Sequence, residues 1–368
     1  MIYLTINEYP SGVFKSQVID RVNRLDKNDE RIHIVSFISL RNFFKKRNQF
    51  NDYRKYVKNI YVIPMFPYLL FWKVNILTLL FISIFLDFEK IQGRGPLASC
   101  LAVILKKIKI AKYVIYDGRA ASYEEAREYT MKNDNNMFCR SLYKAEKLSI
   151  TKSDYCIAVS SALVDYWRSE FNFNGKFKVE PCRPTAVKYK NFSKDELYKL
   201  RSESLFNHED VIIVFAGGDG PWQSYDLLYQ FFKKQKRNNV NLKLLLLCPR
   251  NRYVELLLSE YRDCVKNFFV KPDEVYRHYL YADYGYLVRD DSITNRVSSP
   301  VKFGEYLQAG LKILISNHIG DFSRLVQENK LGLVIKKINQ RVNFNRINFN
   351  ERNSQIKYFK QHFEGKTT

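Results

Sequence analysis

Short apolar runs alternate with longer helical patterns along most of this chain, and no other feature constrains the fold as strongly. In the first half the apolar runs lie at residues 2–6, 32–37, 60–64, 113–119 and 154–160, and a further short strand is expected before a loop at residues 93–95. Short runs of this kind, bounded by polar turns, are typical of buried strands. Strands that alternate with amphipathic helices predict an α/β fold, in which helices cover a doubly wound parallel sheet.

The alternation occurs twice. A polar, charged stretch follows residue 183, and a second series of apolar runs extends from 211–218 to 332–336, with a predicted strand at 267–271 among them. The 368 residues are more than one ordinary core holds. Ligands of open parallel sheets bind beyond the carboxyl ends of the strands, here in a cleft between two domains. We predict Rossmann-like domains at 1–185 and 210–340, a linker at 186–209, and a basic tail or crossover helix at 341–368.

The charge balance favours an anionic partner. Lys and Arg number 60 and Asp and Glu 38, which gives a net charge of +22. Nucleic acid, an acidic lipid surface and a phosphorylated small molecule all fit this sign. The six cysteines form no C-x-x-C pair and none is closely spaced with a histidine. We therefore expect reduced, mostly buried thiols in a cytosolic protein without a zinc site.

One apolar segment, residues 66–88, raises the question of a membrane. Lys73 and Asn75 interrupt it, and the unbroken run at 76–86 is too short to span a bilayer. The segment predicts a buried helix. If one face were exposed beside basic clusters, the same helix would dock on an anionic leaflet. The first twelve residues indicate a strand and a loop rather than a signal peptide.

The sequence SSPVKFGEYLQAG at 298–310 carries the clearest chemical signal. Ser299 is placed to cap a helix with Pro300 in its first turn, and a helix N-terminus attracts phosphate. Lys302 adds a positive charge there, and Glu305 could accept hydrogen bonds from both hydroxyls of a ribose. The alternative is a capped helix with a Lys–Glu surface pair.

A glycine-rich turn, FAGGDGPWQSYD at 215–226, follows a predicted strand and precedes a helix. Gly217 and Gly218 would let the backbone approach a diphosphate closely. Arg289, at the end of a later strand, could supply the cation that this loop lacks. The alternative is a tight turn without a ligand.

The segment at 298–310 resembles the donor-site helix of family 4 glycosyltransferases, which are retaining enzymes of the two-domain GT-B architecture. The resemblance includes Ala282-Asp283 at a strand start, the loop with Gly217 and Gly218, and Gly310 before a strand. Glu305 matches the glutamate that binds ribose in that family. A second family glutamate would fall at Val297, so contacts to the sugar are not implied.

Polar residues of the first half complete the candidate site. Asp117 and Arg119 follow a strand and are the candidate catalytic residues, with Asp117 orienting an acceptor hydroxyl and Arg119 meeting a phosphate. An Asp–Arg structural pair is the alternative. Ser11, Gly12 and Ser160 lie where loops meet helices, and we expect them to line the acceptor side of the cleft.

The resemblance implies transfer of a sugar from a nucleotide diphosphate sugar to a hydroxyl, with retention. No metal or other cofactor is expected, since the chain has no Asp-x-Asp triplet. With the basic charge, we expect a glycan or lipid-linked acceptor and an anionic membrane surface as partners, and no nucleic acid. The expected place is the inner face of a bacterial cytoplasmic membrane, in capsule, O-antigen or lipopolysaccharide synthesis.

Three alternatives stay open. A sugar-nucleotide 2-epimerase of similar fold would need carboxylates and a histidine around the sugar. A non-enzymatic nucleic-acid-binding protein would interleave basic and aromatic residues on one surface. A non-catalytic membrane partner subunit would be indicated by loss of Lys302 or Glu305, and both are present.

Overall fold

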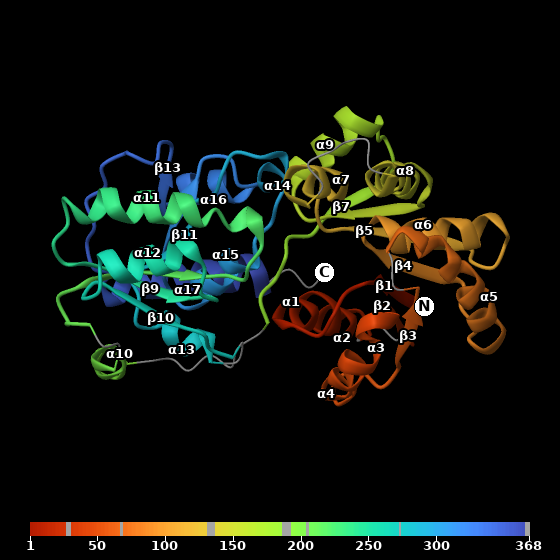
Figure 1. Cartoon of the computed structure of the whole chain (residues 1–368), viewed down its shortest axis with the longest axis horizontal. Helices are drawn as coiled ribbons and strands as arrows, with labels where there is room; N and C mark the ends of the chain where they lie inside the picture. Colours follow the sequence, from red (N-terminus) through yellow and green to blue (C-terminus); the bar gives the residue numbers. More distant parts are fainter. Residues whose placement is uncertain are drawn as a thin grey trace. The chain divides into compact units, whose positions relative to one another are not determined.

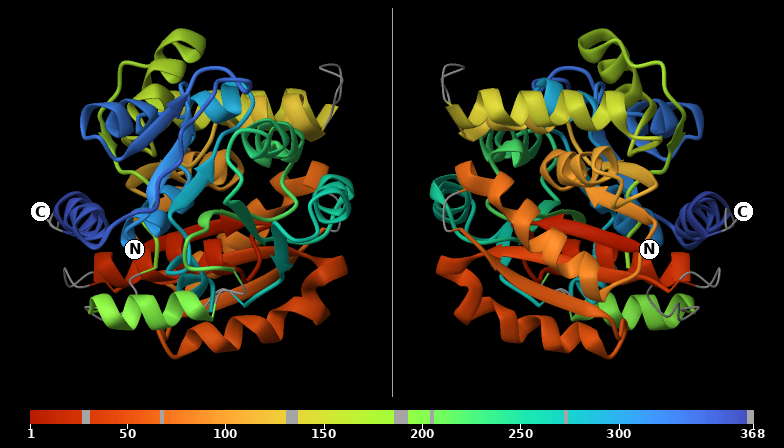
Figure 2. Two further views of the ribbon diagram at one scale, coloured as in Figure 1. Left: turned by 90° about the vertical axis from the view of Figure 1, so that its left-hand side faces the viewer. Right: turned by 90° about the vertical axis from the view of Figure 1, so that its right-hand side faces the viewer.

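The computed structural model describes residues 1–26, 31–66, 69–130, 137–185, 193–203, 206–271 and 274–364. The chain divides into two compact units, 1–185 and 186–368. Each unit is a parallel sheet with helices around it (Figures 1 and 2).

The first unit contains a seven-stranded parallel sheet in the order β3-β2-β1-β4-β5-β6-β7. Its strands are β1 (Ile2–Ile6), β2 (His33–Ser39), β3 (Ile60–Met65), β4 (Lys90–Arg94), β5 (Tyr113–Gly118), β6 (Tyr155–Ala158) and β7 (Phe177–Val179). Its main helices are α1 (Gly12–Phe14), α2 (Asp20–Asp26), α3 (Leu40–Lys46), α4 (Asn51–Arg54), α5 (Asn75–Phe85), α6 (Gly95–Lys107), α7 (Ser122–Glu125), α8 (Met137–Lys152) and α9 (Ser161–Phe171). Shorter helical turns are η1 (Lys15–Ile19), η2 (Arg47–Phe50), η3 (Leu69–Val74) and η4 (Ala126–Thr130).

Both faces of this sheet are buried under helices. Successive side chains of a strand point to opposite faces, so each strand contributes to both cores. Leu4 and Val35 pack into a core with residues of α5, α6 and α8. Tyr3 and Ile34, one position earlier on each strand, pack with η1 and α2 on the other face. Burial on two faces explains why these strands are continuous apolar runs.

The second unit contains a six-stranded parallel sheet in the order β10-β9-β8-β11-β12-β13. Its strands are β8 (Val211–Ala216), β9 (Leu242–Leu247), β10 (Val265–Phe268), β11 (Tyr284–Leu287), β12 (Lys312–Ser316) and β13 (Gly332–Ile335). Its helices are α10 (Lys194–Ser202), η5 (Pro221–Gln223), α11 (Tyr225–Lys236), α12 (Arg252–Glu260), α13 (Val275–Tyr279), α14 (Ile293–Arg296), α15 (Val301–Gln308), α16 (Phe322–Glu328), α17 (Phe349–Phe359) and η6 (Lys360–Glu364). Two separate cores again cover the two faces of the sheet.

The predicted α/β class and the two parallel sheets are confirmed, and several details differ. Gly93 and Arg94 end strand β4 instead of forming a loop. β10 begins two residues earlier than the apolar run at 267–271, because as an edge strand it is only half-buried.

The predicted linker and tail lie only partly within the described residues. Helix α10, in the linker, joins the second unit through Arg201, which forms an ion pair with Asp283. The tail contains α17, which packs against α15. Phe359 and Phe363 are buried in one of the two cores of the second unit.

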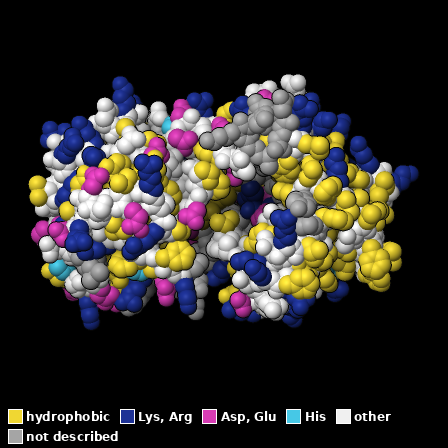
Figure 3. All heavy atoms as spheres, viewed as in Figure 1, with side chains coloured by type: hydrophobic (Ala, Val, Ile, Leu, Met, Phe, Trp, Pro, Cys, Tyr) yellow, Lys and Arg dark blue, Asp and Glu magenta, His cyan; other side chains and the backbone are white. Residues whose placement is uncertain are grey.

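The buried helix predicted for the apolar segment exists, but only part of it is buried. Leu79 of α5 is buried, whereas Leu77, Phe81 and Ile84 are 65%, 61% and 75% exposed. A uniformly apolar sequence cannot indicate which face of a helix meets the core. Figure 3 shows hydrophobic side chains gathered over the α5 and α6 part of the first unit, bordered by Lys and Arg. Within the described residues, no helix is both long and apolar enough to cross a membrane.

Candidate functional site

Helix α15 of the second unit carries the two residues that the sequence singled out most clearly. The helix begins at Val301 with Pro300 as its N-cap, one residue later than predicted. The cap assigned to Ser299 is therefore wrong, because extended Pro300 separates this buried serine from the first helical turn. No side chain of the N-cap residue bonds to the helix, which leaves its positive dipole end to other acceptors.

Lys302 and Glu305 lie one turn apart and are joined by an ion pair of 2.7 Å between Lys302 Nζ and Glu305 Oε2. The hydroxyl of Tyr279, on α13, donates to the same oxygen at 2.7 Å and accepts from Lys302 Nζ at 3.1 Å. Burial and the neighbouring carboxylate raise the pKa of Tyr279 well above its usual value, so the hydroxyl stays protonated. The three side chains form one hydrogen-bonded group, about a quarter exposed at Lys302 and Glu305.

Tyr306 holds α15 against the sheet. A Cβ at Gly285 of β11 would lie 2.2 Å from the Tyr306 ring, so only glycine allows this approach. The Tyr306 hydroxyl accepts a hydrogen bond of 3.1 Å from the backbone N–H of Ala216, the last residue of β8. The residue after Ala216 is Gly217, so the helix and the glycine-rich turn are fixed to each other.

The two glycines of the turn have different surroundings. A Cβ at Gly217 would meet Phe215 at 3.0 Å and Gln223 at 3.1 Å. A Cβ at Gly218 would find no atom within 4 Å, so open space lies beside this residue. The Gly218 carbonyl accepts from the Tyr225 hydroxyl at 2.9 Å, which fixes the turn on its other side.

Arg289 follows β11 and is buried next to this turn. Its guanidinium lies 3.4 Å from Gln223 Oε1 and 3.4 Å from Asn295 Oδ1. These are long contacts, and a charge-assisted bond is normally shorter. The arrangement brings Gly217, Gln223 and Arg289 together at the carboxyl ends of β8 and β11, and the contact of Arg289 with a diphosphate stays a prediction.

Ser224 and Asp290 link the same two strand ends, and the sequence analysis missed both. Ser224 has a positive φ of 52°, which costs energy for a residue other than glycine. Its hydroxyl donates to Asp290 Oδ1 at 2.6 Å and accepts from the Asp290 N–H at 2.9 Å. Gln223 and Ser224 belong to the quoted turn sequence, but Tyr279 has no local signal, since it lies 26 positions before Glu305.

In the first unit, Asp117 ends up fully buried among cations. It lies 2.6 Å from Arg119 Nε and 3.5 Å from Arg21 Nε, and the Tyr3 hydroxyl donates to it at 2.6 Å. Burial alone would raise the pKa of Asp117, but Arg119, Arg21 and Arg94 hold it well below its usual value. This is the structural Asp–Arg pair considered as the alternative. The geometry favours a positioning role for Asp117, since its carboxylate has no exposed surface.

The remaining predicted residues of the first unit lie at helix starts. Ser11 accepts from the Phe14 N–H at 3.1 Å as the cap of α1, whose first residue is Gly12. Ser160 is buried and accepts from the Leu163 N–H at 3.0 Å as the cap of α9. Both caps follow strands, β1 and β6, at the carboxyl edge of the sheet.

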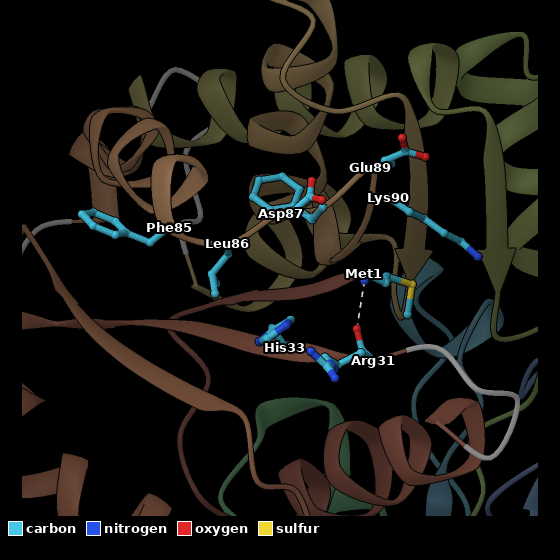
Figure 4. A pocket seen from close by; sticks show the side chains of 9 residues that line it. Met1, Arg31, His33, Phe85, Leu86, Asp87, Glu89 and Lys90 are labelled. Atoms are coloured by element: carbon cyan, nitrogen blue, oxygen red, sulfur yellow. Dashed lines mark hydrogen bonds between the residues drawn. The ribbon is translucent and has the colours of Figure 1, made fainter.

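A hollow of about 570 Å³ lies at the opposite edge of this sheet, where β1, β2 and β4 begin (Figure 4). Met1, Arg31, His33 and Lys90 are among its lining residues, and the Met1 amino group donates to the Arg31 carbonyl at 3.0 Å. Burial and the adjacent cations lower the pKa of His33. Ligands of open parallel sheets bind at the other edge, so this hollow is a poor candidate for the active site.

No cluster of three or more His, Cys, Asp or Glu that could hold a metal occurs among the described residues.

Comparison by sequence gives no match, either to a family model or to a curated protein. Comparison of structures gives many. The chain is similar to Anabaena Alr3699/HepE in complex with UDP and glucose, with a TM-score of 0.67 and 12% identity over 99% of this chain and 95% of that chain. It is similar to sucrose-phosphate synthase from Thermosynechococcus elongatus, with a TM-score of 0.66 and 11% identity over 92% of this chain and 87% of that chain.

WaaG, a glycosyltransferase involved in lipopolysaccharide biosynthesis, matches with a TM-score of 0.63 and 10% identity over 98% of this chain and 91% of that chain. A protein assigned as a UDP-N-acetylglucosamine 2-epimerase from Listeria monocytogenes matches less well, with a TM-score of 0.55 and 10% identity over 100% of this chain and 88% of that chain. At identities this low the likeness establishes the fold, which is the predicted GT-B fold of two Rossmann-like domains.

Proposed function

We propose that this protein is a glycosyltransferase that moves a sugar from a nucleotide diphosphate sugar to a hydroxyl of a glycan or lipid-linked acceptor. The observation that carries the proposal is the joining of α15 to the glycine-rich turn through Tyr306 and Ala216. It brings two elements to which we assign nucleotide binding, far apart in sequence, to one edge of one sheet. The solved complex of HepE with UDP and glucose supports a nucleotide sugar as the donor.

We assign a role in the proposed reaction to the polar residues at this edge of the second sheet. In the proposed reaction negative charge develops on the leaving diphosphate, and Lys302, Arg289 and the start of α15 would stabilise it without a metal. Gly217 and Gly218 allow the backbone to approach the phosphates. The bonds from Lys302 and Tyr279 both go to Oε2 of Glu305, so Oε1 is the atom we assign to the ribose hydroxyls.

Retention of configuration and membership of family 4 follow from the resemblance of residues 298–310 and are part of the proposal. So is the acceptor side, which we place at the carboxyl edge of the first sheet, where Arg119, Ser11, Gly12 and Ser160 lie. There Arg119 would contact the acceptor, and Asp117 would hold Arg119 in position.

The exposed face of α5 supports an anionic membrane as a partner. Leu77, Phe81 and Ile84 would enter the interfacial region of a bilayer. Lys73 lies just before α5 in the chain, and Lys107 lies in the last turn of α6, the helix that packs against α5. Both would meet acidic headgroups. We propose peripheral attachment at the inner face of a bacterial cytoplasmic membrane, in capsule, O-antigen or lipopolysaccharide synthesis.

The test is a screen of the purified chain with UDP, GDP, ADP and CMP sugars, followed by thermal unfolding and by isothermal titration. One nucleotide diphosphate should raise the unfolding temperature and bind with a single site per chain. The epimerase alternative predicts conversion of the donor sugar without an acceptor, which chromatography of the reaction mixture detects. Binding of no nucleotide sugar, or release of an epimer, would overturn the proposal.

A further inference from the structure

Two arginines at the carboxyl edge of the first sheet have nitrogen atoms without a partner. Nη1 of Arg94 and Nη2 of Arg119 are buried and form no hydrogen bond in the described structure. The Arg94 side chain is only 7% exposed. A buried charged donor without an acceptor costs free energy, so such atoms indicate a group that the bound state supplies.

The carboxylates nearby do not fill these positions. Glu8 contacts Arg94 through Nε, with both carboxylate oxygens 2.8 Å away. Asp117 contacts Arg119 through Nε as well. Each carboxylate therefore holds one side of a guanidinium and leaves a nitrogen of the fork unused. Arg352 of the second unit shows the contrast, because both of its Nη atoms donate to backbone carbonyls at 2.6–2.7 Å.

A helix N-terminus lies at the same point. Arg94 is the N-cap of α6, a helix of 13 residues, and it gives no side-chain bond to the helix. Gly95 follows with a φ of +74°, and a Cβ there would find no atom within 4 Å. Open space therefore adjoins the positive end of the helix dipole, where oxyanions bind. Arg94 and Asp117 are register partners on β4 and β5, which places Arg94, Arg119 and the start of α6 together.

We infer that Arg94, Arg119 and the N-terminus of α6 form a binding site for an oxyanion, and that this group belongs to the acceptor. The acceptor then carries a phosphate or a carboxylate near the hydroxyl that is glycosylated. The assignment to the acceptor rests on the proposed function, whereas the oxyanion site itself does not. The site also explains why two arginines are held by two carboxylates, since Glu8 and Asp117 fix the guanidinium planes.

The test measures binding of inorganic phosphate and, separately, of acetate to the full chain by titration and thermal unfolding. Arg94→Gln and Arg119→Gln should each weaken binding of the preferred anion about tenfold, as expected for one lost charge-assisted bond. Glu8→Gln should strengthen it several-fold, because it removes the competing negative charge. Asp165→Asn, which removes a charge from an exposed ion pair on α9, is the matched control and should change nothing.

The opposite responses keep the test decisive even if an arginine variant fails to fold, since Glu8 is a partly exposed loop residue. If phosphate binds more strongly than acetate, the acceptor is phosphorylated. If acetate binds more strongly, the acceptor carries a carboxylate. Anion binding that is absent, or equal in all variants, overturns the site. Nucleotide binding measured on the same variants reports on the proposed function independently, and it should stay unchanged in Arg94→Gln.

Discussion

The Tyr306 hydroxyl accepts a hydrogen bond of 3.1 Å from the backbone N–H of Ala216, although the two residues are 90 positions apart in the sequence. This single bond connects the helix with Lys302 and Glu305 to the strand end that leads into Gly217. A donor that spans both elements needs them at a fixed separation, because misplacement of binding groups reduces their combined effect. Under the proposed function, loss of this bond should therefore weaken nucleotide binding as well as lower stability.

Tyr306→Phe should remove this bond while keeping the ring against Gly285. We expect a loss of about 1 kcal/mol in the free energy of unfolding and a several-fold weaker binding of the nucleotide diphosphate. Tyr286→Phe is the matched control, since Tyr286 is equally buried and its hydroxyl has no hydrogen-bond partner in the described structure. Denaturant unfolding and titration of both variants provide the measurements. Equal nucleotide binding by Tyr306→Phe and the wild type would contradict the link between the two elements.

Lys302→Ala and Glu305→Ala should each weaken nucleotide binding about tenfold, with less than about 1 kcal/mol lost in stability. The small stability effect is expected because the pair is partly exposed. Lys312→Ala is the control, as Lys312 is 22% exposed and forms a comparable 2.6 Å ion pair with Glu351. If Lys312→Ala weakens nucleotide binding as much as Lys302→Ala, the effect is one of net charge, and the assignment of Lys302 is wrong.

Gly218→Ala should lower nucleotide affinity without lowering the stability of the fold. Nothing lies within 4 Å of the added methyl group, so the free energy of unfolding should change by less than about 0.5 kcal/mol. Nucleotide affinity should fall, because the methyl group occupies the space assigned to the diphosphate. Gly217→Ala meets Phe215 and Gln223 and should instead lower stability. A Gly218→Ala variant that binds nucleotide like the wild type would exclude close approach at this residue.

The fold could be predicted from the sequence because most of its strands are buried on both faces. β8 and β12 are nearly continuous apolar runs, VIIVFA and KILIS, and such runs stand out whatever surrounds them. β10 was displaced in the prediction because half-buried edge strands mix polar and apolar residues. The class of fold and the approximate strands thus follow from burial alone.

Contacts between side chains were harder to predict, because they join elements that are distant in sequence. Lys302 and Glu305 were found through helical spacing, but Tyr279 reaches them from a five-residue helix with no pattern of its own. Arg94 was hidden in a segment that looked like a glycine loop. Its burial becomes visible only when β1, β4 and β5 lie side by side.

The exposed apolar face of α5 should bind anionic bilayers. Phe81→Glu removes apolar area and adds a repelled charge, so partitioning onto vesicles of phosphatidylglycerol should fall by on the order of tenfold. Phe269→Glu is the control, because Phe269 is 82% exposed and belongs to the second unit. Flotation of both variants and the wild type, with phosphatidylcholine vesicles for comparison, gives the result. Equal flotation of Phe81→Glu and the wild type would rule out this face.

Glu146 should make the folded chain less stable as the pH rises, which is the opposite of the usual effect of an ion-paired carboxylate. This buried residue of α8 accepts from the Ser122 and Tyr123 N–H groups at 3.0 and 2.8 Å, and burial raises its pKa to about 8. The folded chain then holds a proton that the unfolded chain releases near pH 4.5. The contribution of Glu146 to stability is therefore complete below about pH 4.5 and is lost as the pH rises through about 8.

Glu146→Gln removes the titration but keeps an acceptor for the start of α7. At about pH 5 the variant should be as stable as the wild type or slightly less stable, since one backbone bond is lost. At about pH 9 it should be more stable, because the wild type then buries a negative charge. The measurement is the difference in unfolding temperature between the two proteins across this pH range. The effects of the other titrating groups, which both proteins share, cancel in this difference. A constant difference would mean that the two backbone N–H groups outweigh burial and keep Glu146 ionised.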